Sequence, residues 1–289
     1  ELVVRALIDP GGVVVTEDPT YLGAVQVLAT SGAKPVAIPV DREGMQTDLL
    51  AARLAAGLRP ALCYLAPTFQ NPSGVVMSAA RRQHLAELAD RYGFVVVDDD
   101  PYRELAFAPP PARLSASVDP ERSVTLGTFS KVVAPGLRVG WVHAPGWLHP
   151  HLVRLKQATD LHTSSLGQRM LAGLVAEPGW FDRRAAALVV AYRDRAAALA
   201  GALRAGTDRL SFDDPLGGMF LWARLPAEGP TAESLAVEAI AAGVAFVPGT
   251  AFTHDGRPTH RMRLCFATLP SAELTAAGAT LATVVERAG

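Results

Sequence analysis

Apolar runs alternate with amphipathic segments through the first part of this 289-residue chain. The apolar runs occupy residues 13–17, 34–40, 61–66 and 94–99, and segments with helical periodicity lie between them. Continuous apolar runs indicate strands that are buried on both faces, as in parallel sheets covered by helices. The alternation therefore predicts an α/β fold with a mainly parallel sheet and helices on both faces.

Further signals extend this sheet and separate a second unit. Ser78 and Gly93 are suited to begin and end one helix. The pattern then predicts two strands over 123–130 and 138–144, a helical region from about 150 to 206, and shorter strands over 217–225, 243–249 and 261–267. The change in pattern predicts a large domain over residues 1–200 and a smaller α+β domain over 201–289.

Composition excludes several classes of protein. The net charge is −1 and no Lys/Arg cluster occurs, so no nucleic-acid partner is expected within these residues. Cys63 and Cys265 both lie in apolar strand-like runs, which predicts buried free thiols and neither a disulfide framework nor a metal site. No apolar run is long enough to cross a bilayer and no signal peptide is visible, so we expect a cytoplasmic protein with no membrane partner.

Lys131 is one of only three lysines, the others being Lys34 and Lys156. It lies in the loop GTFSKVVAPGLRVGW, between small hydroxyl residues and an arginine, Arg138. Arginine already supplies most positive charges in this chain, so a lysine in this loop indicates a need for its amine. Lys131 is therefore the first candidate for a catalytic residue.

Three consecutive aspartates, residues 98–100, end the strand predicted over 94–99. Side chains alternate along a strand, so Asp99 points to one face and its neighbours point to the other. A charged strand end that caps the next turn would explain the triplet by itself. Ligands of open α/β sheets bind at the carboxyl ends of strands, however, and there Asp99 would join Lys131 and Arg138.

An amine, a carboxylate and a guanidinium are the groups that pyridoxal 5′-phosphate (PLP) requires. Lys131 would form the Schiff base, Asp99 would keep the pyridine nitrogen protonated, and Arg138 would pair with the phosphate. Thr128 and Ser130, in the same loop, could add hydrogen bonds to the phosphate. The residues therefore predict a PLP site.

The motifs resemble those of the fold type I, class I/II aminotransferases. TFSK with PGLRVG is similar to the family's lysine motif, and VVVDDDPYREL is similar to its strand with the pyridinium-binding aspartate. PTFQNPSG, EDPTYLGA and MRLCFA match three further motifs. The resemblance implies that Asn71 and Tyr102 contact the ring hydroxyl, that Tyr21 stacks on the ring, and that Asn71 and Arg263 bind the substrate. Arg261 shares the strand face of Arg263 and is the alternative ligand of the α-carboxylate.

The resemblance implies transfer of an amino group between an amino acid and a 2-oxo acid by a homodimer. It is strongest to the branch with 2-aminoadipate aminotransferases, and it extends to the effector domains of aminotransferase-like transcription regulators. A lyase, racemase or cyclising enzyme on the same scaffold remains an alternative, as does an effector-binding domain. ELVVRALID reads as a helix without a lead-in, so we expect the 289 residues to be part of a longer chain with a preceding phosphate loop and arm.

Overall fold

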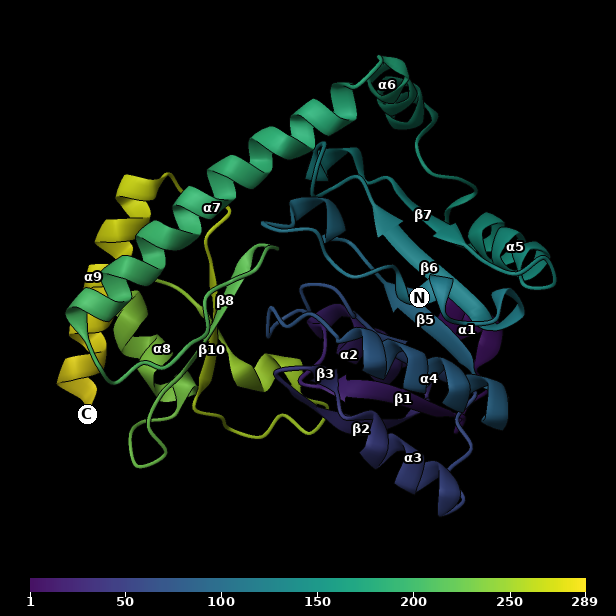
Figure 1. Cartoon of the computed structure of the whole chain (residues 1–289), viewed down its shortest axis with the longest axis horizontal. Coiled ribbons are helices and arrows are strands. Elements are labelled where there is room, and N and C mark those ends of the chain that lie inside the picture. Colours follow the sequence, from purple (N-terminus) through teal and green to yellow (C-terminus); the bar gives the residue numbers. More distant parts are fainter.

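The computed structural model describes residues 1–289 and contains a seven-stranded sheet of order β3-β2-β1-β4-β5-β6-β7 (Figure 1). The five central strands are parallel, and β3 and β7 pair antiparallel at the two edges. The prediction of a mainly parallel sheet is confirmed. The strands are β1 Val13–Asp18, β2 Lys34–Asp41, β3 Gly44–Met45, β4 Leu62–Leu65, β5 Val95–Asp99, β6 Ser123–Thr128 and β7 Gly140–His143.

Helices cover both faces of this sheet. One buried cluster joins the sheet to α3 and α4, and another joins its opposite face to α1, α2 and α5. Ser78 accepts a hydrogen bond from the backbone N–H of Arg81 at the start of α4, and Gly93 ends that helix in the left-handed conformation, as predicted. These helices are α1 Leu2–Leu7, α2 Leu22–Ser31, α3 Thr47–Ala55, α4 Ala79–Tyr92 and α5 His149–Asp160.

The C-terminal part has a sheet of its own, with three antiparallel strands in the order β8-β10-β9. The strand predicted over 243–249 is wrong in extent, because only two residues of β10 find partners in β9. The elements of this part are α6 Ser165–Ala176, α7 Trp180–Gly206, β8 Phe220–Arg224, α8 Ala232–Ala241, β9 Val247–Pro248, β10 Arg261–Cys265 and α9 Ser271–Ala288. Short 3₁₀ turns occupy Arg103–Leu105, Leu114–Ala116, Pro120–Arg122, Pro135–Leu137 and Gly249–Phe252.

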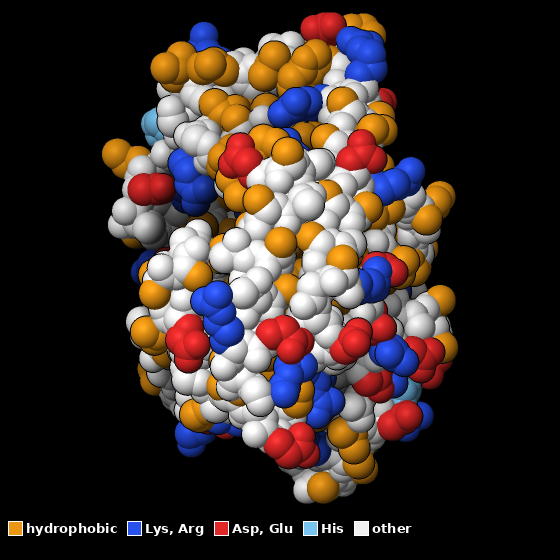
Figure 2. Space-filling model, turned by 90° about the vertical axis from the view of Figure 1, so that its left-hand side faces the viewer, with side chains coloured by type: hydrophobic (Ala, Val, Ile, Leu, Met, Phe, Trp, Pro, Cys, Tyr) orange, Lys and Arg blue, Asp and Glu red, His pale blue; other side chains and the backbone are white.

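The long helix α7 extends from α6, on the side of the large sheet, to α9 and the small sheet (Figure 1). The largest buried cluster packs α7 against α8, α9 and the small sheet, and it also takes in Tyr102 and Leu105 from the segment after β5. The division that we propose at residue 200 therefore falls within a continuous helix. On the face shown in Figure 2, acidic and basic side chains are interspersed. No helix of the structure combines the length and apolar character needed to cross a membrane.

Candidate active site

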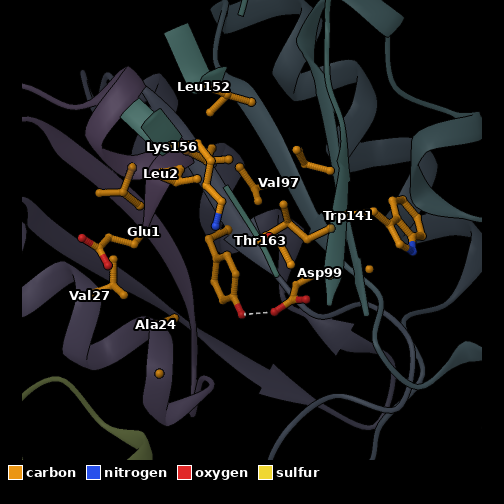
Figure 3. Close-up of a pocket in the computed structure, with 18 of the residues that line it drawn as sticks. Glu1, Leu2, Ala24, Val27, Val97, Asp99, Trp141, Leu152, Lys156 and Thr163 are labelled. Atoms are coloured by element: carbon orange, nitrogen blue, oxygen red, sulfur yellow. Dashed lines mark hydrogen bonds between the residues drawn. The ribbon is translucent and has the colours of Figure 1, made fainter. Parts of the chain in front are cut away.

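A cavity of about 740 Å³ lies over the sheet face that α1, α2 and α5 cover, and it reaches the end of β5 (Figure 3). Its lining is mostly apolar. Three of the predicted cofactor residues line it, namely Tyr21, Asp99 and Arg138, and Tyr64 lies among them. Residues from separate parts of the sequence thus meet at one cavity, as expected for the carboxyl ends of strands in an open sheet.

Asp99 is the only member of the aspartate triplet that lines this cavity. Asp98 instead accepts a hydrogen bond from the backbone of Ser115, and Asp100 forms an ion pair of 2.6 Å with Arg113. Asp99 therefore points to the opposite face of β5 from Asp98 and Asp100, as strand alternation predicts. Burial raises the pKa of Asp99 to about 6, although a hydrogen bond from Tyr64 opposes that rise.

Tyr21 lies at the N-terminal end of α2 and is 42% exposed at the cavity. Its ring lies over Gly23, where an added Cβ atom would be 2.5 Å from the ring carbon Cε1. Any larger residue at position 23 would displace the ring. The glycine therefore permits the ring position that the stacking prediction for Tyr21 requires.

Lys131 follows β6 in a short loop and is half-buried. In that loop the backbone N–H of Ser130 donates to Thr128 Oγ1 at 3.1 Å, so the Thr128 hydroxyl shapes the turn. Lys131 Nζ lies 6.0 Å from the centroid of the Tyr102 ring. Burial lowers the pKa of Lys131, and the positive charges of Arg138 and Arg263 lower it further.

Arg263 is held on β10 between two aromatic rings. Its Cζ lies 4.1 Å from the Phe220 ring centroid and 4.9 Å from that of Phe252, and its Nη1 donates to Asn71 Oδ1 at 2.8 Å. Its Nε is buried without a hydrogen-bond partner. A buried unpaired N–H is costly, so the site has a donor available for a ligand oxygen. Arg261 is exposed and lies level with Arg224 of β8.

Tyr102 lies between the cavity residues around Asp99 and the surroundings of Arg263 on the small sheet. It is 4% exposed and meets the Phe220 ring edge-on at 5.8 Å. Burial raises the pKa of Tyr102, the Asp99 charge raises it further, and Arg263 lowers it. Tyr102 is therefore close both to the cavity wall and to the arginine of the small sheet. The predicted site residues form one neighbourhood, although Lys131, Asn71, Tyr102, Thr128, Ser130 and Arg263 do not line the cavity itself.

Comparison with known proteins identifies the family. The model of aminotransferase classes I and II matches residues 1–281. This chain belongs to that family. Aromatic-amino-acid aminotransferase 1 of Thermococcus litoralis is 39% identical over 95% of this aminotransferase and 67% of the relative.

Two solved structures are similar to this aminotransferase over 99% of its length. The multiple substrate aminotransferase from Thermococcus profundus has a TM-score of 0.93 and 36% identity, with 72% of that chain covered. The α-aminoadipate aminotransferase from Thermus thermophilus, complexed with N-(5′-phosphopyridoxyl)-L-leucine, has a TM-score of 0.92 and 35% identity, with 74% covered. The predicted PLP-dependent transferase fold is thereby confirmed.

Three residues near the candidate site, Tyr64, Phe220 and Phe252, are not among those predicted from the sequence. Tyr64 could have been found from alternation, since it lies on the strand beside β5, whereas Phe220 and Phe252 approach Arg263 only through the tertiary fold. The prediction that both cysteines are buried is wrong. Cys63 is buried, but Cys265 shares the exposed face of β10 with Arg261 and is itself exposed.

Proposed function

We propose that this aminotransferase binds PLP at the ends of β5 and β6 and uses Lys131 to move an amino group between an amino acid and a 2-oxo acid. One observation carries the assignment of residues. A half-buried amine lies near the ends of strands that also bring a carboxylate, Asp99, and a guanidinium, Arg138, to one cavity. These are the three charged groups that the cofactor's linkage, ring and phosphate require.

The residues present fit PLP. Asp99 accepts one hydrogen bond on Oδ2 and none on Oδ1, so it keeps an oxygen for a protonated ring nitrogen. Tyr21 supplies an exposed aromatic face, and Arg138 supplies a cation for the phosphate. The bound cofactor would withdraw electrons from the substrate carbon that carries the amino group.

Lys131 would act as the base that carries the proton to and from the substrate Cα. A base at this position needs a neutral amine near pH 7, and the free pKa of lysine is well above that. Burial, Arg138 and Arg263 all lower the pKa of Lys131. The site therefore changes the amine in the direction that the reaction requires.

Arg263 would bind the substrate α-carboxylate. The stacking rings of Phe220 and Phe252 hold its planar fork, and Asn71 engages one end of it. The unpaired Nε leaves a donor for a carboxylate oxygen. This grip would fix the orientation of the Cα–H bond relative to Lys131 Nζ.

The test uses the scarcity of lysine in the chain. Protein reconstituted with PLP should absorb visible light, and borohydride reduction should attach the label to Lys131, with Lys131→Ala losing both signals. Lys34→Ala and Lys156→Ala are matched controls that should keep them. Label on Lys34 or Lys156 in the wild type would refute the assignment.

Product analysis then separates the alternatives. Incubation with an amino acid and a 2-oxo acid should yield the exchanged pair in equal amounts. A lyase or racemase would produce ammonia or the opposite enantiomer, and an effector-binding domain would bind without turnover. Either result would overturn the transfer reaction for this chain.

We also propose that the enzyme acts as a homodimer in the cytoplasm. Support for self-association comes from apolar side chains of helix α6 that are 43–70% exposed, namely Leu166, Met170 and Val175. Exposed apolar side chains on one helix are typical of interaction surfaces. Light scattering should give twice the chain mass, and cell fractionation should place the protein in the cytoplasmic fraction.

A further inference from the structure

Tyr64 makes the shortest polar contact of the cavity wall. Its Oη donates to Asp99 Oδ2 at 2.6 Å, and the dashed line in Figure 3 marks this bond. The two residues come from the neighbouring parallel strands β4 and β5, with Tyr64 level with Val97, two positions before Asp99. A hydroxyl that donates to a carboxylate at this distance forms a charge-assisted hydrogen bond, about twice as strong as a neutral one.

We propose that Tyr64 is a positioning residue of the active site, which holds one Asp99 oxygen and leaves the other for the pyridine nitrogen of PLP. This inference rests on the proposed function. A carboxylate bound by one oxygen has lost its freedom to rotate, so the second oxygen has a fixed direction. Tyr64 would also favour the charged form of Asp99, which is the form that a protonated ring nitrogen needs.

The Tyr64 phenol can donate its hydrogen bond throughout the neutral pH range. Burial raises the pKa of Tyr64 well above the usual value, and the neighbouring Asp99 charge raises it further, so the proton stays on the phenol. Tyr64 is also the strongest influence that keeps Asp99 ionised. The other charged side chains that act on Asp99 are Asp100, which opposes ionisation, and Lys131, which favours it. Glu17, from β1, interacts with Asp99 as a like charge if it ionises.

The aromatic body of Tyr64 has a separate structural role. It packs against the buried cluster between the sheet and α1, α2 and α5. Its hydroxyl has Asp99 as its hydrogen-bond partner. Tyr64→Phe should therefore keep the packing and remove only the contact with Asp99.

The experiment titrates Asp99 directly in cofactor-free protein. Carbon-13 NMR of aspartate-labelled protein, with the signal assigned by Asp99→Asn, gives the pKa in wild type and Tyr64→Phe. Loss of a hydrogen bond to a charged group should raise the Asp99 pKa by about one to two pH units. Tyr92→Phe is the matched control, because that ring lies on α4 beside Arg59 and should leave the titration unchanged.

Activity of the loaded enzyme gives a second readout. Tyr64→Phe should lower kcat by roughly 10- to 100-fold and leave KM for the amino acid nearly constant, because Arg263 binds the substrate elsewhere. An unchanged Asp99 pKa, or an equal change in Tyr92→Phe, would overturn the proposal. If the wild type binds no PLP, the proposed function fails, and the cofactor-free titration alone decides whether Tyr64 controls Asp99.

Discussion

Replacing Arg263 with lysine would keep a positive charge on β10 and remove the planar fork. The guanidinium lies between the Phe220 and Phe252 rings, with Nη1 on Asn71 and a buried, unpaired Nε. A lysine ammonium is a compact charge that cannot form the same two parallel bonds with a carboxylate. If Arg263 binds the substrate as proposed, the substitution weakens that binding without changing the net charge of the site.

The magnitude follows from one lost charged hydrogen bond. Such a bond contributes about 1.5–3 kcal/mol, and each 1.4 kcal/mol corresponds to a factor of ten. Arg263→Lys should weaken amino-acid binding by roughly 10- to 150-fold. Visible absorbance of the bound cofactor should be almost unaltered, because the proposed cofactor residues Asp99, Arg138 and Tyr21, which line the cavity, are untouched.

The assay is a titration of the PLP-loaded protein with amino acid, followed by its change in visible absorbance. Arg261→Lys provides the matched control, because Arg261 lies on the same strand face but is exposed and level with Arg224. An unchanged titration of Arg263→Lys would refute the assignment, as would a larger loss in Arg261→Lys.

Two other predictions concern carboxyl groups. Asp99→Asn should reduce kcat much more than PLP affinity. Asp98→Asn should have little effect, because Asp98 does not line the cavity and burial raises its pKa to about 7, so that it is partly uncharged at neutral pH already. Stopped-flow kinetics with both variants checks this, and a greater loss in Asp98→Asn would contradict it. Burial also raises the pKa of Glu17 to about 8, so its contribution to stability is complete below about pH 4.5 and is lost as pH rises toward 8. Urea unfolding of Glu17→Gln should show a weaker fall in stability over that range, and an identical fall would contradict the prediction.

Much of the fold could be predicted because burial on both faces leaves a continuous apolar signal. The same local logic separated Asp99 from Asp98 and Asp100, since alternation along a strand depends on neighbouring residues alone. Cys265 shows where a prediction from an apolar run alone fails. The apolar run predicts a buried cysteine there, but alternation places Cys265 on the strand face of Arg261 and Arg263, and at the end of β10 its side chain is exposed.

The remaining features depend on contacts between distant segments. Asn71 and Arg263 are 192 positions apart and meet only because the small sheet packs beside the large one. The aromatic rings around Arg263 likewise come from β8 and the turn Gly249–Phe252, whose approach no local pattern encodes. Strand 243–249 was overpredicted because pairing with β10, and not the apolar run, decides how many residues become a strand.

Helix α7 holds the backbone near Lys131 and near Arg263 at a fixed separation. Near its start, Arg184 Nε donates to the backbone of Val132, the residue after Lys131, and eleven positions later Arg195 Nη1 donates to the backbone of Ala267, four residues after Arg263. At 1.5 Å per residue, the two anchor points are about 16 Å apart along one rigid rod. The distance between Lys131 and Arg263, the proposed base and the proposed substrate ligand, is thus fixed in part by a helix that holds the backbone near each of them.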